Sequence, residues 1–227
     1  VSSIIVVELA GGNKQWAGVP GTMLLLGAAA AAYPMGRFMD RFGRRPGLSI
    51  GLLFGLAAAL LAAWAVITQS LGLFLLSVVG MGLSRGSNDL GRYAAAEANP
   101  LQQRARALSL VVLGGTFGSI AGPLFVDWSG RFAAQAGLPL FSGPWLAAAL
   151  FSLLALLVIH FFLRPDPQTI GRELAALEPA TPVDQSRSRP YRQIWSDPRT
   201  KVATGAMICG QLAMVTVMTI TPVHMHG

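Results

Sequence analysis

Several long stretches of this sequence contain no Asp, Glu, Lys or Arg, and they limit the fold more than any other feature. Four of them run from Gln15 to Gly36, from Gly47 to Ser84, from Ala107 to Val126 and from Val202 to Val223. About 20 apolar residues in a helix cross the ~30 Å hydrocarbon core of a bilayer. In lipid the backbone has to satisfy its own hydrogen bonds, and these runs lack the alternation of a membrane barrel strand. The sequence therefore predicts an all-α fold, a polytopic bundle of transmembrane helices.

Six spans are predicted, at residues 16–36, 47–67, 71–91, 108–126, 144–163 and 202–222. The third of them extends past Ser84 and includes Arg85 and Asp89. Residues 1–10 are apolar but too few to cross a bilayer. We interpret them as the outer end of a further helix whose beginning is absent. The last span has no partner after it, so we expect a fragment that is truncated at both ends. Only 12% of the residues are charged, about half the share in soluble domains, which excludes an ordinary soluble enzyme.

The net charge of +7 is confined to particular connections, which argues against nucleic acid as a partner. Of the 17 basic residues, 14 lie in three connections, at residues 36–47, 92–106 and 164–201. The connections on the other side hold only Lys14 and Arg131. Lys and Arg concentrate in cytoplasmic loops. The three basic connections are therefore predicted to face the cytoplasm, and the protein is predicted to span the inner (plasma) membrane.

The longest connection suggests the domain organisation. Residues 164–198 are rich in proline and charge, a composition typical of a linker. We therefore expect a six-helix bundle at 1–163 with a truncated first helix, a cytoplasmic linker at 164–198, and the first helix of a second bundle at 199–227. We expect the complete protein to be a monomer.

The first basic connection carries a motif, Gly-Arg-Phe-Met-Asp-Arg-Phe-Gly-Arg-Arg-Pro at residues 36–46. Its glycines allow close backbone approach. Asp40 is placed to accept from helix N-terminal amides or to pair with an arginine, and the arginines are placed to bind the anionic inner leaflet. This stretch resembles the loop between the second and third helices of the major facilitator superfamily, with Phe38 in place of the usual Leu. The matching residues are Gly36, Asp40, Arg41, Gly43, Arg44 and Arg45.

The resemblance implies a protein of two six-helix halves that works by alternating access. It also implies that residues 36–47, here called the gating loop, hold the two halves together on the cytoplasmic side in the outward-facing state. In the second basic connection, Glu97, Pro100, Arg104 and Arg106 resemble an acidic-Pro-Arg pattern of the same superfamily. We expect a structural salt bridge there.

A second stretch, residues 114–123, resembles the Gly-x-x-x-Gly-Pro element of proton-coupled exporters in that superfamily. Gly118 and Gly122 are one helical turn apart and predict a flat face for helix packing, while Pro123 removes a backbone donor and is expected to bend the helix. The exporter pattern departs here at Ser109 and at residues 126–127. Ordinary helix packing is the alternative.

Polar residues inside predicted spans are candidates for a substrate or proton pathway, because charges in lipid are costly. Arg85 and Asp89, together with Arg92, have the spacing of one helix face, and Asn88 lies beside them. They are predicted either to line a central cavity or to form a structural pair at the cytoplasmic rim.

Two more candidates lie elsewhere. Glu8 is a candidate proton carrier, with a solvated outer loop as the alternative. Gln211 is a candidate substrate contact, with helix–helix hydrogen bonding as the alternative.

The sequence contains no phosphate-binding Gly-x-x-x-x-Gly-Lys-Ser/Thr, so direct coupling to ATP is not expected. It also shows no metal-ligand pattern, and no cofactor or enzymatic activity is expected. We expect a proton-driven secondary transporter whose partners are the lipid bilayer, protons and a small-molecule substrate. Efflux of small amphipathic or drug-like compounds is the first expectation, and import of a small metabolite, anionic metabolites included, is the alternative. A non-transporting receptor or assembly factor of the same fold is the alternative from a different class.

Overall fold

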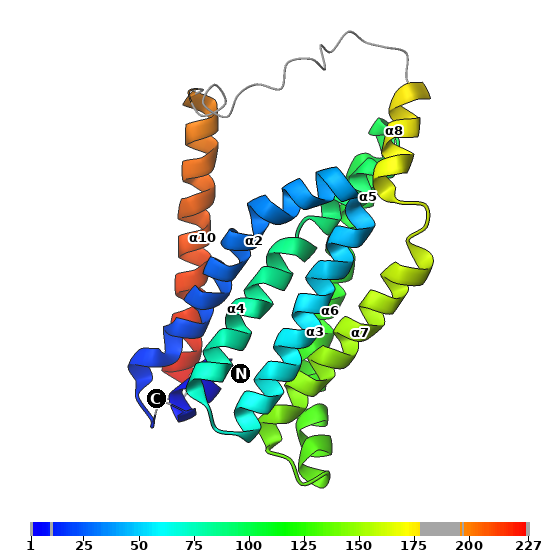
Figure 1. Cartoon of the computed structure of the whole chain (residues 1–227). Helices are drawn as coiled ribbons and strands as arrows, with labels where there is room; N and C mark the ends of the chain where they lie inside the picture. The colour runs from blue at the N-terminus through cyan, green and yellow to red at the C-terminus, as the bar shows by residue number, and fades with distance from the viewer. Residues whose placement is uncertain (1, 10, 178–195, 197, 226–227) are drawn as a thin grey trace. The chain divides into compact units, whose positions relative to one another are not determined.

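The computed structural model describes residues 2–9, 11–177, 196 and 198–225, and all its regular elements there are helical (Figure 1). The chain divides into two compact units, Val1–Leu177 and Glu178–Gly227. The second unit contains the helix α10, Pro198–Met225. The first unit contains the helices α1 Ser2–Leu9, α2 Val19–Phe42, α3 Arg44–Ile67, α4 Leu71–Asn88, α5 Gly91–Glu97, α6 Arg104–Gln135, α7 Gly143–Phe162 and α8 Pro167–Leu177. Short 3-10 turns lie at Lys14–Gly18, Leu101–Gln103 and Leu140–Ser142.

Among the described residues, four helical segments are long and apolar enough to cross a membrane. They are Gln15–Phe42, Arg44–Ile67, Leu101–Gln135 and Leu140–Phe162. The predicted all-α membrane fold is thus confirmed. The predicted spans at 71–91 and 202–222 correspond to the helices α4 and α10, and their crossing of a membrane stays a prediction.

The helices are longer at their basic ends than the charge pattern suggests. The predicted connection at 36–47 is almost entirely helical, because α2 continues to Phe42 and α3 begins at Arg44. Gly43 alone separates the two helices. Arginine is a good helix former, so the charged residues that mark the membrane boundary do not end a helix.

α4 packs between α2 and α3, and glycines bring the three backbones together (Figure 1). A Cβ atom on Gly82 would clash with the carbonyl oxygen of Leu24, and one on Gly86 would clash with that of Ala28. A Cβ on Gly27 of α2 would lie 2.5 Å from the carbonyl oxygen of Val79. Residues 82 and 86 therefore form a Gly-x-x-x-Gly face at which two helices approach closely.

A compact apolar core lies at the end of the bundle away from Gly43. It joins the end of α3, the start of α4, the start of α7 and the helix α1. Phe74 is fully buried there and stacks edge-on against Trp145 at a centroid distance of 5.5 Å. Ile5 and Val6 of α1 are buried in the same cluster. α1 is thus held by hydrophobic contacts although it is only eight residues long.

Candidate functional site

The guanidinium group of Arg44, at the first position of α3, binds two carboxylates. Its Nε lies 2.8 Å from Oε2 of Glu97 and its second terminal nitrogen lies 2.6 Å from Oε1, a two-point ion pair with α5. The same nitrogen lies 3.2 Å from Oδ1 of Asp40 in the last turns of α2. The Arg44 side chain is 12% exposed, whereas that of Asp40 is 68% exposed. We call these three residues the gating cluster. The salt bridge expected at Glu97 is present, and its partner is Arg44.

A third carboxylate, that of Asp166, which the sequence analysis did not single out, binds the start of α3. Oδ1 of Asp166 accepts from the backbone amide of Arg44 at 3.1 Å, and Oδ2 accepts from that of Arg45 at 2.9 Å. Oδ1 also accepts from the amide of Gln168 at 2.9 Å, at the start of α8. The role of accepting from helix N-terminal amides, predicted for Asp40, thus falls to Asp166.

Gly43 is required by both the backbone and the space around it. Its φ of +103° lies in the region that favours glycine, and its amide donates to the carbonyl of Met39 at 2.9 Å. A Cβ atom at this position would lie 2.6 Å from Oδ2 of Asp166. The turn between α2 and α3 therefore depends on the absence of a side chain.

The other predicted residues of the gating loop differ in their surroundings. The Arg45 guanidinium donates to the carbonyl of His160, at the end of α7, at 2.8 Å. The contact of the loop arginines with the inner leaflet stays a prediction. Arg41 is exposed, and its guanidinium carbon lies 5.4 Å from the ring centre of Phe42. A Cβ atom on Gly36 would meet nothing within 4 Å among the described residues, so no close approach depends on it there.

Arg85, Asn88 and Asp89 share one pocket of about 320 Å³ between α3, α4 and α7. All three side chains are exposed. The Asn88 amide donates to the hydroxyl of Ser84 at 3.3 Å. The remaining lining residues are Gly55, Met81, Ser84 and Ser152. The structure thus brings the three predicted pathway residues together, with a positive, a negative and a neutral polar group around one hollow.

The predicted common helix face of residues 85, 89 and 92 is wrong at its far end. α4 ends at Asn88, and Arg92 belongs to the separate helix α5. Asparagine, aspartate and glycine at 88, 89 and 91 are poor helix formers, which favours the break. Among the described ion pairs, Asp89 pairs with Arg92 at 3.3 Å and not with Arg85. The charge of Asp89 is therefore partly neutralised, whereas Arg85 forms no ion pair with the described residues of the first unit.

Glu8, one of the two remaining pathway candidates, does not line this pocket. Glu8 is exposed on α1. Gln211 is exposed in α10, which is described by itself as part of the second unit. Their roles stay predictions.

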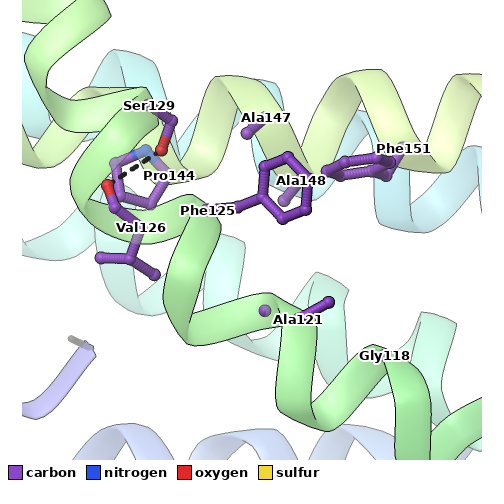
Figure 2. Close-up of a pocket in the computed structure, with 10 residues that line it drawn as sticks. Gly118, Ala121, Phe125, Val126, Ser129, Pro144, Ala147, Ala148 and Phe151 are labelled. Carbon is purple, nitrogen blue, oxygen red and sulfur yellow. Dashed lines mark hydrogen bonds between the residues drawn. The ribbon is translucent and has the colours of Figure 1, made fainter.

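Gly118 and Gly122 line an apolar pocket of about 330 Å³ between α6 and α7 (Figure 2). Phe125 of α6 and Phe151 of α7 stack edge-on across it, with ring centres 5.4 Å apart. A Cβ atom on either glycine would meet nothing within 4 Å in the described part of the chain. Pro123 lies inside α6, which continues to Gln135. Helix packing at this face stays a prediction.

The long apolar helices, the basic turn between α2 and α3, and the polar pocket on α4 are the features of a polytopic membrane protein built as a helical bundle. The chain belongs to the Major Facilitator Superfamily, whose family model matches residues 3–227. Members of this family are transporters and not enzymes, so this chain is part of a multi-pass membrane protein.

Three relatives show how much of such a protein the chain covers. It is 35% identical over 229 residues to the uncharacterized MFS-type transporter YdeG of Bacillus subtilis, which covers 100% of this chain and 53% of the relative. It is 33% identical over 218 residues to the uncharacterized MFS-type transporter YddS of the same organism, covering 95% and 50%.

It is also 31% identical over 213 residues to the riboflavin transporter RfnT of Brucella anthropi, covering 92% of this chain and 49% of the relative. The chain thus spans about half the length of the curated relatives that it matches. No solved structure matches it significantly.

Proposed function

We propose that the complete protein is a proton-coupled secondary transporter that works by alternating access and exports small amphipathic or drug-like compounds. The observation that carries the proposal is the gating cluster. It is assembled at the junction of α2 and α3, where the superfamily motif lies. In such a mechanism two helical bundles rock about a site near the middle of the membrane.

The gating cluster is arranged to bind a second partner. Glu97 holds Arg44 by two hydrogen bonds, and Arg44 in turn contacts only one oxygen of Asp40. Asp40 is largely exposed, so its other oxygen is available to donors. The donors proposed for it are those of the second bundle when the cytoplasmic side closes. Opening that side breaks these contacts while the Arg44–Glu97 pair stays within the first bundle.

The pocket at Arg85 supplies part of a pathway for substrate or protons. A charged side chain in a membrane helix is a functional candidate by default, and this pocket places three polar residues around one space. We propose that this pocket faces the central cavity of the complete protein. The orientation proposed with it places the basic turn between α2 and α3 on the cytoplasmic side of the inner membrane.

The proposal is tested with the complete gene product in everted membrane vesicles. A proton gradient is imposed, and its dissipation is recorded on adding tetraphenylphosphonium and other lipophilic cations. Export predicts dissipation that disappears in Asp40→Asn, because that variant removes the charge of the gating cluster that faces solvent. Unchanged dissipation in Asp40→Asn overturns the gating role. If lipophilic cations do not dissipate the gradient in vesicles with the wild-type protein, cation export is overturned.

Import of a small anionic or polar metabolite is the second candidate, and Arg85 is the observation that favours it. An exposed guanidinium beside Asn88 is suited to an anion or to a polar ring, and one of the relatives is described as a riboflavin transporter. In the same vesicles this candidate predicts a response to organic anions or riboflavin that is lost in Arg85→Ala. A wild type without any response, together with specific ligand binding, would favour a non-transporting receptor of the same fold.

A further inference from the structure

One carboxylate caps two helices that are far apart in the sequence. The first amides of any helix have no acceptor within that helix. Asp166 accepts from Arg44 and Arg45, the first two residues of α3, and from Gln168 in the first turn of α8. Arg44 and Asp166 are separated by 122 positions. A negative charge at a helix N-terminus is favourable, and this single side chain serves two such ends.

Two further side chains bind the carboxyl-terminal ends of helices in the same region. The side chain of Arg45 donates to the carbonyl of His160 in the last turn of α7, at 2.8 Å. The side-chain amide of Gln168 donates to the carbonyl of Asp40, in the last turn of α2, at 3.0 Å. The segment between α7 and α8 is therefore held by the start of α3 on one side and by the end of α2 on the other.

Two glycines allow α3 and α8 to lie this close to their neighbours. Gly43 leaves room for Asp166, as described above. A Cβ atom on Gly171 of α8 would lie 2.9 Å from the carbonyl oxygen of Glu97. α8 is thus seated against α5 at the residue that binds Arg44. Figure 1 shows α5 and α8 gathered at the end of the first unit where α2 meets α3.

We infer that Asp166 is a positioning residue of the transport cycle, which links α8 to the gating cluster so that both move as one body. α8 is the last element of the first unit before the chain passes to the second. A displacement of α8 is therefore transmitted through Asp166 to the start of α3, and hence to Arg44. Asp166 itself contacts neither the substrate pocket nor Asp40. The link between α3 and α8 is inferred from these contacts. Its role in a transport cycle rests on the proposed function.

Hydrogen exchange of the complete gene product, read by mass spectrometry, tests the link directly. The amides of Arg44 and Arg45 are protected by Asp166 and not by their own helix, so a peptide that begins before Gly43 reports on the cap. Asp166→Ala is expected to speed exchange on the order of tenfold at this peptide and at residues 168–172 together. Asp166→Asn keeps the oxygen shared by Arg44 and Gln168 and loses the acceptor of Arg45. It is expected to fold and to give an intermediate increase that is larger at α3.

Glu173→Gln is the matched control. Glu173 is an exposed carboxylate on α8 that forms no ion pair with the described residues of the first unit. Its replacement is expected to leave exchange at α3 unchanged. Faster exchange at α8 alone in both Asp166 variants would overturn the inference, because the two helix starts would then be independent.

The transport readout separates positioning from binding. Asp166→Asn is expected to lower the maximal transport rate several-fold and to leave the apparent KM unchanged, because the Arg85 pocket is untouched. A changed KM with an unchanged rate would overturn the positioning role. If no compound moves in the wild type, the proposed transport function fails, whereas the exchange experiment still decides whether α3 and α8 are linked.

Discussion

The guanidinium of Arg44 shows how much of the proposed mechanism depends on the geometry of one side chain. Its two-point contact with Glu97 fixes the direction of the group, and the third contact then falls on Asp40. A planar guanidinium presents donors in a rigid fork, whereas a lysine ammonium is a compact charge on a flexible chain. A positive charge at position 44 without the planar guanidinium group therefore does not reproduce the contacts with Glu97 and Asp40.

Arg44→Lys is expected to cost about 1 kcal/mol of stability, because it keeps the charge and loses the two-point pair, part of which is screened by solvent. In a protein of this size that corresponds to a melting temperature lower by roughly 2–4 °C. Thermal unfolding in detergent measures the shift, with Arg41→Lys as the control, since Arg41 is exposed. Equal melting temperatures for Arg44→Lys and the wild type would contradict the geometric role.

Gly43→Ala is expected to destabilise the first unit by about 1–3 kcal/mol, the typical cost of a strained backbone position. The new Cβ would sit at a φ of +103° and 2.6 Å from Asp166. Gly36→Ala, in the same motif but with open space around it, is expected to be neutral or slightly stabilising within its helix. Folded yield and melting temperature of the two variants measure the difference. A lower melting temperature in Gly36→Ala together with an unchanged one in Gly43→Ala would contradict the requirement for glycine at position 43.

At the scale of elements, the sequence predicts which segments are helices better than it predicts how they meet. All six predicted spans correspond to helices, because uninterrupted apolar runs leave the backbone few other choices. The spacing of the charged residues does not indicate the break after Asn88. The Gly82-x-x-x-Gly86 face is also not singled out in the sequence analysis, although this glycine spacing is present in the sequence. The predicted packing face lies at Gly118 and Gly122, where a Cβ atom would meet nothing within 4 Å in the described part of the chain.

The residues of the candidate site also differ in how well the sequence predicts them. The motif fixes Asp40, Arg44 and Gly43 because they are close in sequence and their spacing is unusual. Asp166 lies 122 positions from Arg44 in a proline-rich segment, and no local pattern indicates a contact across that distance. Contacts between remote residues depend on packing, which a single sequence does not reveal.

Gly82→Ala is expected to separate α2 from α4, because the added Cβ would meet the carbonyl oxygen of Leu24, a backbone atom that has no rotamer to change. The expected cost of such overpacking is about 1–3 kcal/mol. Gly72→Ala is the control on the same helix, since nothing lies within 4 Å of its Cβ position. Thermal unfolding of the two variants tests the packing, and equal stability would show that α2 and α4 do not approach as closely as described.

At the scale of the whole molecule, the helices of the first unit form one bundle, with the contacts among Asp40, Arg44, Glu97 and Asp166 at one end and a polar pocket on α4. The family assignment and the half-length coverage of relatives fit a protein in which a second bundle supplies the opposing wall. In that account the gating cluster controls access from one side of the membrane, and the Arg85 pocket contributes to a site that each side reaches in turn. Transport then requires both parts, while ligand binding requires only the pocket.

Counterflow in proteoliposomes is the most direct measurement of this central claim. The complete gene product is reconstituted, loaded with unlabelled riboflavin or tetraphenylphosphonium, and diluted into the same compound carrying a label. Alternating access predicts transient accumulation of label without any imposed ion gradient, and slower accumulation in Arg44→Lys than in Arg41→Lys. Binding of either compound without accumulation of label would contradict the account and would identify a receptor instead of a transporter.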